Sequence, residues 1–355
     1  MDNRLLLGFA SAQELWRFVG ERVAQRNAPS STQRPLLIRI LFERGVGVDL
    51  TDVPSRTRLT KVPGSIDAGL VETAIERLPP LASGMDLCVS RQRGRRSFQG
   101  ATCHLMSGSY PEGSFCQLDE GVLVTGPELT FLQMARVLDD DLLVAYGYEI
   151  CGYFARTSAE HGFCNCPALT STSKIKDYLD RLARLRGNRG EGMPWGYARA
   201  LRALRYVRDG AASPEEAVTS MVLTLPGAWG GYGLPPARLN AAVRLSAAAA
   251  ELFGIEEFVC DMSWDGHGLV AEFQGGQHKQ RTRRSYDSRK GNVLGADGWT
   301  IVEVDRGMLE RASLMDEVAK SISAGLGIRW RQPGASRATR QLRLRNKLLR
   351  YLDER

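Results

Sequence analysis

The alternation of apolar and polar positions along the chain predicts a mixture of helices and strands. Apolar residues recur at helical spacing in 12–19, and Ser11 precedes them as an expected N-cap. The apolar run 36–42 is a predicted strand. A second apolar run, 121–126, ends at Pro127 and a leucine-rich stretch. Because proline is favoured at the first position of a helix, we expect a strand there followed by a helix to about residue 135.

The second half of the chain repeats this mixed pattern. We expect a helix over 198–207, a buried strand over 299–304 and a helix over about 308–324. Residues 241–252 are rich in alanine, and propensity alone favours a helix there. The glycine-rich and charged stretch 186–194 is the best candidate for a linker between two domains.

A hairpin is predicted around Asp265 and Gly266, which form an Asp-Gly pair between the apolar runs 257–260 and 269–271. If these two residues form the turn, Asp261 lies opposite Val270. Glu272 is then a diagonal neighbour of Asp261 on the same face, about 7 Å away. Two carboxylates in one small volume are unfavourable unless a cation lies between them, and hard divalent cations bind oxygen ligands of this kind.

Basic residues follow the hairpin, and more of them occupy the C-terminal tail after residue 328. On the expected helix after the hairpin they are Lys279, Arg281, Arg283, Arg284, Arg289 and Lys290, and in the tail they include Arg343 and Arg345. Both sets suit contact with nucleic-acid phosphates. The alternative for each is a solvated helix face, with the tail docking through its leucines.

Composition changes this picture only slightly. The chain has 355 residues, enough for two domains, and its net charge of +7 favours an anionic partner. No long apolar window or secretory signal is evident, so we expect a cytoplasmic protein without membrane contact. The seven cysteines lack paired C-x-x-C spacing, which argues against a zinc site at 161–166 and favours reduced thiols.

The segment from Asp261 to about Asp305 resembles the PD-(D/E)XK nuclease superfamily, in particular very-short-patch-repair-like endonucleases. The matching positions include Glu272, Gly275, His278, Asp287, Lys290, Leu294, Gly298 and Trp299, and upstream the Ser213-Pro214-Glu215-Glu216 opening of a helix. The resemblance covers roughly residues 200–325. It implies a strand at 240–245 in place of the helix that propensity favours, and it implies that Glu216 supports the metal site.

This resemblance implies a Mg²⁺ or Mn²⁺ ion held by Asp261, Glu272 and the carbonyl of Phe273. A water activated by this ion would then hydrolyse the phosphodiester bond. The chain departs from the superfamily at Gln274, where a lysine is usual. A neutral amide orients water but carries no positive charge. His278 is a candidate substitute base, although it also suits a helix cap or a bond to Asp287. Glu272 is alternatively a partner for Arg289.

The segment 121–135 resembles part of the AbiEi-type antitoxins, which are transcriptional regulators. It carries Val124-Thr125-Gly126-Pro127 and Thr130, but Gln133 stands where that pattern has aspartate. On this resemblance the chain is a DNA-binding regulator that keeps a nuclease-like fold without catalysis, and a cognate toxin is a partner. A second copy of the chain, forming a homodimer, is a further option for a partner.

Together these patterns predict an α/β protein in three parts. Residues 1–194 form a separate α+β domain with a regulatory role as one option. Residues 195–327 form a restriction-endonuclease-like core, a mixed sheet flanked by helices. Residues 328–355 form a basic helical tail. The expected function is metal-dependent cleavage of DNA, and the alternative is non-catalytic regulation.

Overall fold

The computed structural model describes residues 4–26, 53–78, 81, 84–95, 98–157, 162–274 and 281–353. The strand expected at 36–42 lies outside these ranges. By its contacts the chain divides into unit 1, residues 1–151 and 155–207, and unit 2, residues 152–154 and 208–355. This division falls after Val207, whereas the sequence prediction ended the first domain at 194.

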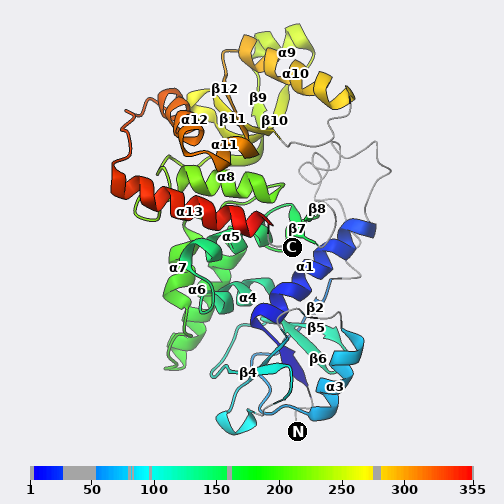
Figure 1. Cartoon of the computed structure of the whole chain (residues 1–355). Helices are drawn as coiled ribbons and strands as arrows, with labels where there is room; N and C mark the ends of the chain where they lie inside the picture. The colour runs from blue at the N-terminus through cyan, green and yellow to red at the C-terminus, as the bar shows by residue number, and fades with distance from the viewer. Residues whose placement is uncertain are drawn as a thin grey trace. The chain divides into compact units, whose positions relative to one another are not determined.

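Unit 1 contains a six-stranded mixed sheet (Figure 1). Its strand order is β2-β5-β6-β1-β3-β4, in which β1 pairs parallel with β6 and antiparallel with β3. The strands are β1 (Leu5–Leu7), β2 (Ser55–Arg56), β3 (Met85–Val89), β4 (Ala101–Leu105), β5 (Phe115–Asp119) and β6 (Val122–Thr125). The three leucines of β1 are buried, because this strand lies inside the sheet.

Helices cover the sheet of unit 1 and extend beyond it. They are α1 (Phe9–Arg26), α3 (Ala68–Arg77), α4 (Pro127–Met134), α5 (Asp140–Cys151), α6 (Thr172–Asn188) and α7 (Tyr197–Leu204), with a short turn η2 (Gln92–Gly94). A separate pair of strands joins β7 (Phe154–Arg156) to β8 (Phe163–Asn165).

Three sequence predictions for unit 1 have clear outcomes. The strand before Pro127 and the helix that starts at this residue are confirmed as β6 and α4. The cap expected at Ser11 is wrong, because α1 already begins at Phe9. Ser11 is buried and joins the helix to β3, since its hydroxyl donates to Gly84 O and accepts from Asp86 N. The 186–194 stretch, which was expected to link two domains, begins in the last turn of α6 and lies wholly within unit 1.

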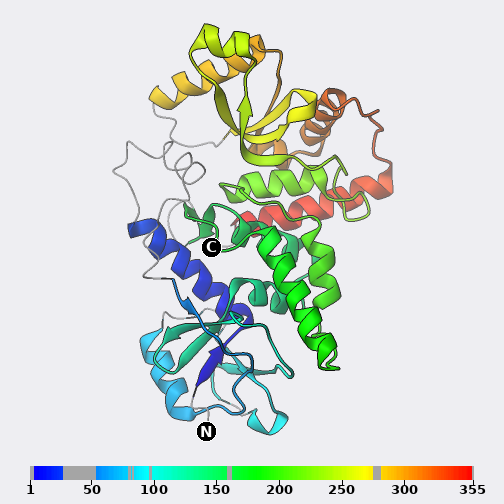
Figure 2. The same cartoon turned by 180° about the vertical axis from the view of Figure 1, so that it is seen from behind.

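Unit 2 is built on a four-stranded mixed sheet with the order β12-β11-β10-β9, seen from both sides in Figures 1 and 2. The strands β9 (Arg238–Arg244), β10 (Glu257–Trp264) and β11 (Leu269–Gln274) are antiparallel neighbours, whereas β12 (Thr300–Asp305) runs parallel to β11. The strand predictions at 240–245 and 299–304 are therefore confirmed. The alanine-rich stretch forms a helix only from Ala247.

Helices flank this sheet, as expected for a mixed sheet in an α/β protein. They are α8 (Pro214–Thr224), α9 (Ala247–Phe253), α10 (Arg281–Ala296), α11 (Arg306–Glu310), α12 (Ala312–Gly325) and α13 (Ala335–Asp353), with a one-turn η3 (Asp265–His267). On one face, Val293 and Leu294 of α10 pack with Phe258, Cys260 and Val270. The helix expected over 308–324 is divided at Arg311, whose backbone is extended between α11 and α12.

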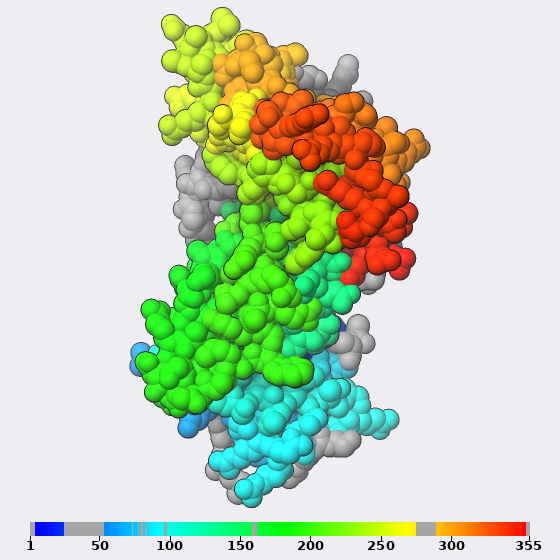
Figure 3. Space-filling view, turned by 90° about the vertical axis from the view of Figure 1, so that its left-hand side faces the viewer, coloured from blue at the N-terminus to red at the C-terminus, as the bar shows by residue number. Residues whose placement is uncertain are grey.

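The tail forms α13, which lies beside α8 and contributes to the core of unit 2 (Figures 1 and 2). Leu344 and Leu348 are fully buried. The same helix also presents an outer face to solvent, and Figure 3 shows it in red on the surface of unit 2. The tail is therefore part of unit 2, as in the alternative of docking through leucines.

Unit 2 includes three residues from far upstream, 152–154. Tyr153 N donates to Ala211 O at 2.7 Å, and the Tyr153 ring lies close to Gly210. Gly210 has a positive φ of 91°, which glycine adopts without strain. No helix in the described ranges is long and apolar enough to cross a membrane.

Candidate active site in unit 2

Glu216 is a buried carboxylate in the first turn of α8. Ser213 caps this helix and accepts from Glu216 N, and the Ser213 hydroxyl in turn donates to Glu216 Oε1 at 3.1 Å. Glu216 Oε2 accepts from Ala212 N at 2.8 Å and from Asn240 Nδ2 at 2.5 Å. Burial, together with the charge of Asp261, raises the pKa of Glu216 to about 8.

Asn240 belongs to the same arrangement, although the sequence analysis did not single it out. Its φ of 43° is left-handed within β9, a conformation that asparagine tolerates better than most residues. Its side-chain amide donates to Gly210 O at 3.0 Å as well as to Glu216. These two bonds hold the strand in this conformation and fix the Glu216 carboxylate.

The hairpin between β10 and β11 has a longer turn than the sequence prediction. Trp264 pairs with Leu269, so four residues connect the strands, and Gly268 supplies the positive φ of 56°. The prediction that Asp261 lies opposite Val270 is wrong, because Val270 pairs with Ser263. The paired residues end at Met262 and Ala271, so Asp261 and Glu272 are the next residues along their strands.

Asp261 joins the two strands through its side chain, whose Oδ2 accepts from Phe273 N at 2.7 Å. The carboxylate therefore replaces a main-chain acceptor just beyond the last backbone pair, Met262 with Ala271. The charge of Asp261 also raises the pKa of both Glu216 and Glu272. Three carboxylates, from α8, β10 and β11, thus share one electrostatic environment.

Glu272 is paired with a lysine from α10. Lys290 Nζ donates to Glu272 Oε1 at 2.7 Å and to Val259 O at 2.6 Å, and only 8% of Lys290 is exposed. Burial lowers the pKa of Lys290, but the Glu272 carboxylate and its neighbours outweigh burial and raise the pKa above the ordinary value of a lysine. Lys290 therefore stays charged at neutral pH.

Glu272 remains close to its protonation midpoint despite this pairing. Burial is the largest cause, followed by the charge of Asp261, and together they raise the pKa of Glu272 to about 7 even though Lys290 lowers it. The Cys260 thiol also hydrogen-bonds to this carboxylate. One positive charge from Lys290 thus lies among three acidic groups, of which Glu216 is buried and Asp261 and Glu272 are half-buried. Added positive charge near Asp261 and Glu272 would therefore be favourable.

The donor set fits a hard divalent cation in chemistry and does not form a closed cage. Carboxylate oxygens and a backbone carbonyl suit Mg²⁺, which usually keeps several waters and needs only one or two carboxylates. Among the described residues, no group of three or more His, Cys, Asp or Glu side chains is arranged to hold a metal ion. One oxygen of Glu272 is already bonded to Lys290.

The remaining predicted site residues lie in different surroundings. Gln274 is half-buried at the end of β11, and its amide donates to Glu303 at 3.3 Å. His278 and Lys279 lie outside the described residues. Arg281, Arg283 and Arg284 form the start of α10, but only their backbone is described.

Two predicted phosphate contacts need correction. Lys290 is buried against Glu272 and Val259, so it does not lie on the solvated face of its helix. Arg345 is 2% exposed, because it faces the core side of α13 together with the buried Leu344 and Leu348. Arg289 and Arg343 are exposed, and Arg289 also donates to Phe253 O at 3.1 Å. The prediction that Glu272 pairs with Arg289 is wrong, because its partner is the next residue, Lys290.

The sequence does contain a signal for Lys290. Val293 and Leu294 follow it by three and four residues, which places all three on one side of a helix. A lysine on the apolar side of a helix must find a buried acceptor or reach solvent along its stem.

No family model matches this chain, and no significantly similar curated protein or solved structure was found.

Proposed function

We propose that unit 2 is a metal-dependent endonuclease domain of the PD-(D/E)XK type, which hydrolyses phosphodiester bonds in DNA. The observation that carries this proposal is the meeting of Asp261 in the middle of β10, Glu272 in β11 and the buried ammonium of Lys290. Acidic oxygens and a fixed cation are the groups that phosphodiester hydrolysis requires. The mixed sheet flanked by helices supports the proposal, since the resemblance implies such a core.

Lys290 offers an answer to the missing lysine at position 274. The ammonium comes from α10 instead of β11, and it is bonded to the same glutamate that would bind the metal. An ammonium has three donors, and Glu272 and Val259 O accept from two of them within the described residues. We infer that Lys290 stabilises the negative charge that develops on the phosphate oxygens.

The metal would be held by Asp261, Glu272 and the carbonyl of Phe273. When bound, it would lower the pKa of a coordinated water and neutralise charge on the non-bridging oxygens. Asp261 is positioned by its bond to Phe273 N, and Glu216 is held by Ser213 and Asn240. Gln274 would orient water through its amide. The exposed Arg289 and Arg343 would contact backbone phosphates and contribute affinity without sequence preference.

Plasmid cleavage tests this proposal. The full chain is incubated with supercoiled plasmid in the presence of Mg²⁺ or Mn²⁺, with chelator as the blank. We expect nicking that Asp261→Ala and Glu272→Ala reduce by on the order of a hundredfold or more, because each removes a ligand of the proposed metal.

The matched controls carry the same kind of change elsewhere in the same hairpin. Asp265 lies in the turn and pairs with Arg238, and Glu257 begins β10. Asp265→Ala and Glu257→Ala should leave the nicking rate within about twofold, since surface substitutions away from a site have small effects. Equal cleavage by all four variants would contradict the proposal. Cleavage that is just as fast in the chelator blank as with Mg²⁺ or Mn²⁺ would contradict it too.

One observation favours a second function, a DNA-binding regulator without catalysis. The Lys290–Glu272 pair neutralises one carboxylate without a metal, and no three-ligand cluster occurs in the described residues. In that case the chain retards DNA in a gel without cutting it. Arg343→Ala with Arg350→Ala should then weaken retardation and flatten its salt dependence. Both arginines are exposed, so this variant should keep α13 folded.

A further inference from the structure

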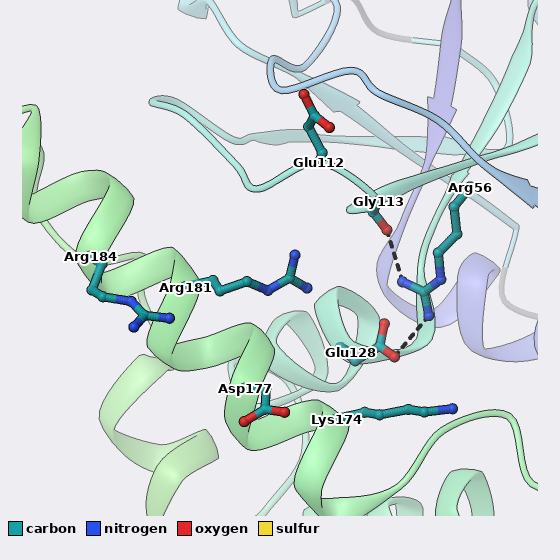
Figure 4. Close-up of a pocket in the computed structure, with 8 residues that line it drawn as sticks. All are labelled: Arg56, Glu112, Gly113, Glu128, Lys174, Asp177, Arg181 and Arg184. Carbon is teal, nitrogen blue, oxygen red and sulfur yellow. Dashed lines mark hydrogen bonds and ion pairs between the residues drawn. The ribbon is translucent and has the colours of Figure 1, made fainter.

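Unit 1 contains a charged pocket that the proposed nuclease function does not use. It has a volume of about 530 Å³, and Figure 4 shows its lining residues as sticks. The lining consists of Arg56, Glu112, Gly113, Glu128, Lys174, Asp177, Arg181 and Arg184. All of these belong to unit 1. A volume of several hundred cubic ångströms is in the range of small-molecule sites.

One wall of the pocket is a single face of α6. Lys174, Asp177, Arg181 and Arg184 are spaced by three, four and three residues, which aligns them along the helix. From first to last they span about 15 Å at 1.5 Å per residue. The apolar residues of the same helix, including Tyr178 and Leu182, are buried on another face, so α6 holds the charged row toward the pocket.

Arg56 forms the opposite side and is fixed in place. Its Nη1 donates to Gly113 O at 2.9 Å, and its Nη2 donates to Glu128 Oε1 at 2.8 Å. Glu128 is buried and also accepts from Thr170 Oγ1 at 2.8 Å. Figure 4 shows the Arg56 guanidinium across the pocket from Arg181. Because a guanidinium has five donors, Arg56 retains donors beyond these two bonds.

The cations of the α6 wall are not neutralised in the same way. Within the described residues, Lys174, Arg181 and Arg184 form no ion pair, and the Arg181 guanidinium lies over the Tyr178 ring at 5.9 Å from its centroid. Asp177 and Glu112 are the carboxylates that remain after Glu128 pairs with Arg56. Three cations therefore face two carboxylates around one hollow.

We propose that this pocket binds a nucleotide. The phosphates would bond to Arg181, Arg184 and Lys174, with Arg56 on the opposite side, since guanidinium groups bind phosphate in bidentate fashion. Glu112 and Asp177 would accept hydrogen bonds from ribose hydroxyls or from amino groups of the base. These carboxylates favour a ligand that has donors as well as phosphates, and they disfavour a bare polyphosphate. The lining contains no exposed aromatic ring, so the phosphates would supply most of the affinity.

Calorimetric titration of the full chain tests the proposal. The probes are ATP, pyrophosphate and a single-stranded 12-mer, in EDTA so that no metal bridges a probe to unit 2. We expect ATP to bind more tightly than pyrophosphate, and its affinity to fall with salt. Arg181→Ala with Arg184→Ala should weaken ATP binding by about ten- to hundredfold, because each removes a charge-assisted hydrogen bond.

Two controls separate the pocket from other basic surfaces. Lys176→Ala removes a cation from another face of α6, where it pairs with Asp180, and should not change ATP affinity. Asp261→Ala alters the candidate site of unit 2 and should not change ATP affinity either. The nucleotide proposal can therefore hold even if the nuclease proposal fails. All the substituted residues of α6 are exposed, and circular dichroism will verify the fold.

Three results would overturn the inference. The first is ATP affinity that the Arg181 and Arg184 substitutions leave unchanged. The second is pyrophosphate binding as tight as that of ATP, which would remove the role of the carboxylates. The third is tighter binding of the 12-mer that the same substitutions abolish, which would make the pocket part of a nucleic-acid track.

Discussion

Replacing Lys290 by methionine should destabilise unit 2 strongly and in a pH-dependent way. Methionine keeps most of the side-chain volume and removes the ammonium, which leaves the half-buried Glu272 next to Asp261 without its charged donor. Breaking a buried pair by removing one partner costs about 3–5 kcal/mol. Glu272 reduces this cost at low pH, because it takes up a proton.

The pH dependence follows from the titration of Glu272. In the wild type its pKa is about 7, whereas in the variant, without Lys290, the pKa must rise further. Between pH 6 and pH 8 the wild-type folded state releases most of one proton and the variant keeps it. The variant's loss of stability should therefore be larger at pH 8 than at pH 6 by about 1.4 kcal/mol, the value of one pKa unit.

Urea unfolding with hydrogen–deuterium exchange of peptides from β10 and β11 measures this difference. Arg289→Met is the matched control, since it removes the neighbouring cation of the same helix, which is exposed. Glu272→Gln with Lys290→Met should recover much of the loss, because no buried charge is then left without its partner. The reasoning fails if Lys290→Met costs no more than Arg289→Met, or if its cost is the same at both pH values.

Two further predictions concern unit 2. The stability contributed by Glu216 and Glu272 should be fully present below about pH 4.5 and should be lost as pH rises through about 7 to 8, because burial raises both pKa values. The loss is on the order of 3 kcal/mol for Glu272 and on the order of 5 kcal/mol for Glu216. Glu216→Gln should flatten this profile in urea titrations between pH 5 and 8.5, and an unchanged slope would contradict the assignment. Arg345 is buried, and its Nε atom has no hydrogen-bond partner among the residues that the structure describes. Arg345→Met should therefore be neutral or stabilising in thermal unfolding, whereas a loss above about 2 kcal/mol would indicate an acceptor outside those residues.

The strands of unit 2 could be predicted because their sequence is apolar and bounded by turn residues. The strand at 240–245 required the resemblance, since Ala241 and Ala242 favour a helix and only pairing with β10 makes them a strand. The exact register was beyond local reasoning. Both Gly266 and Gly268 are compatible with a turn, and the choice between them shifts every cross-strand partner.

The carboxylates of the candidate site were recognised from their spacing, but the partners that hold them were not. Lys290 is 18 residues from Glu272, and Asn240 is 24 residues from Glu216, so both contacts depend on how the helices pack on the sheet. Basic residues in a run look alike in the sequence. Burial separates Lys290 from Arg289 and Arg345 from Arg343, and burial is a property of tertiary packing.

The assignment of residues 152–154 to unit 2 affects how the protein can be dissected. A fragment that starts at Arg208 would lack Tyr153, and Ala211 O would lose its main-chain donor three residues from Pro214, where α8 begins. Failure of such a fragment to cut DNA would then reflect a disturbed helix entry as readily as a missing domain. Point variants of the whole chain avoid this ambiguity. If tethering a 152–154 peptide restores cleavage by the fragment, the disturbed start of α8 was the cause of the failure.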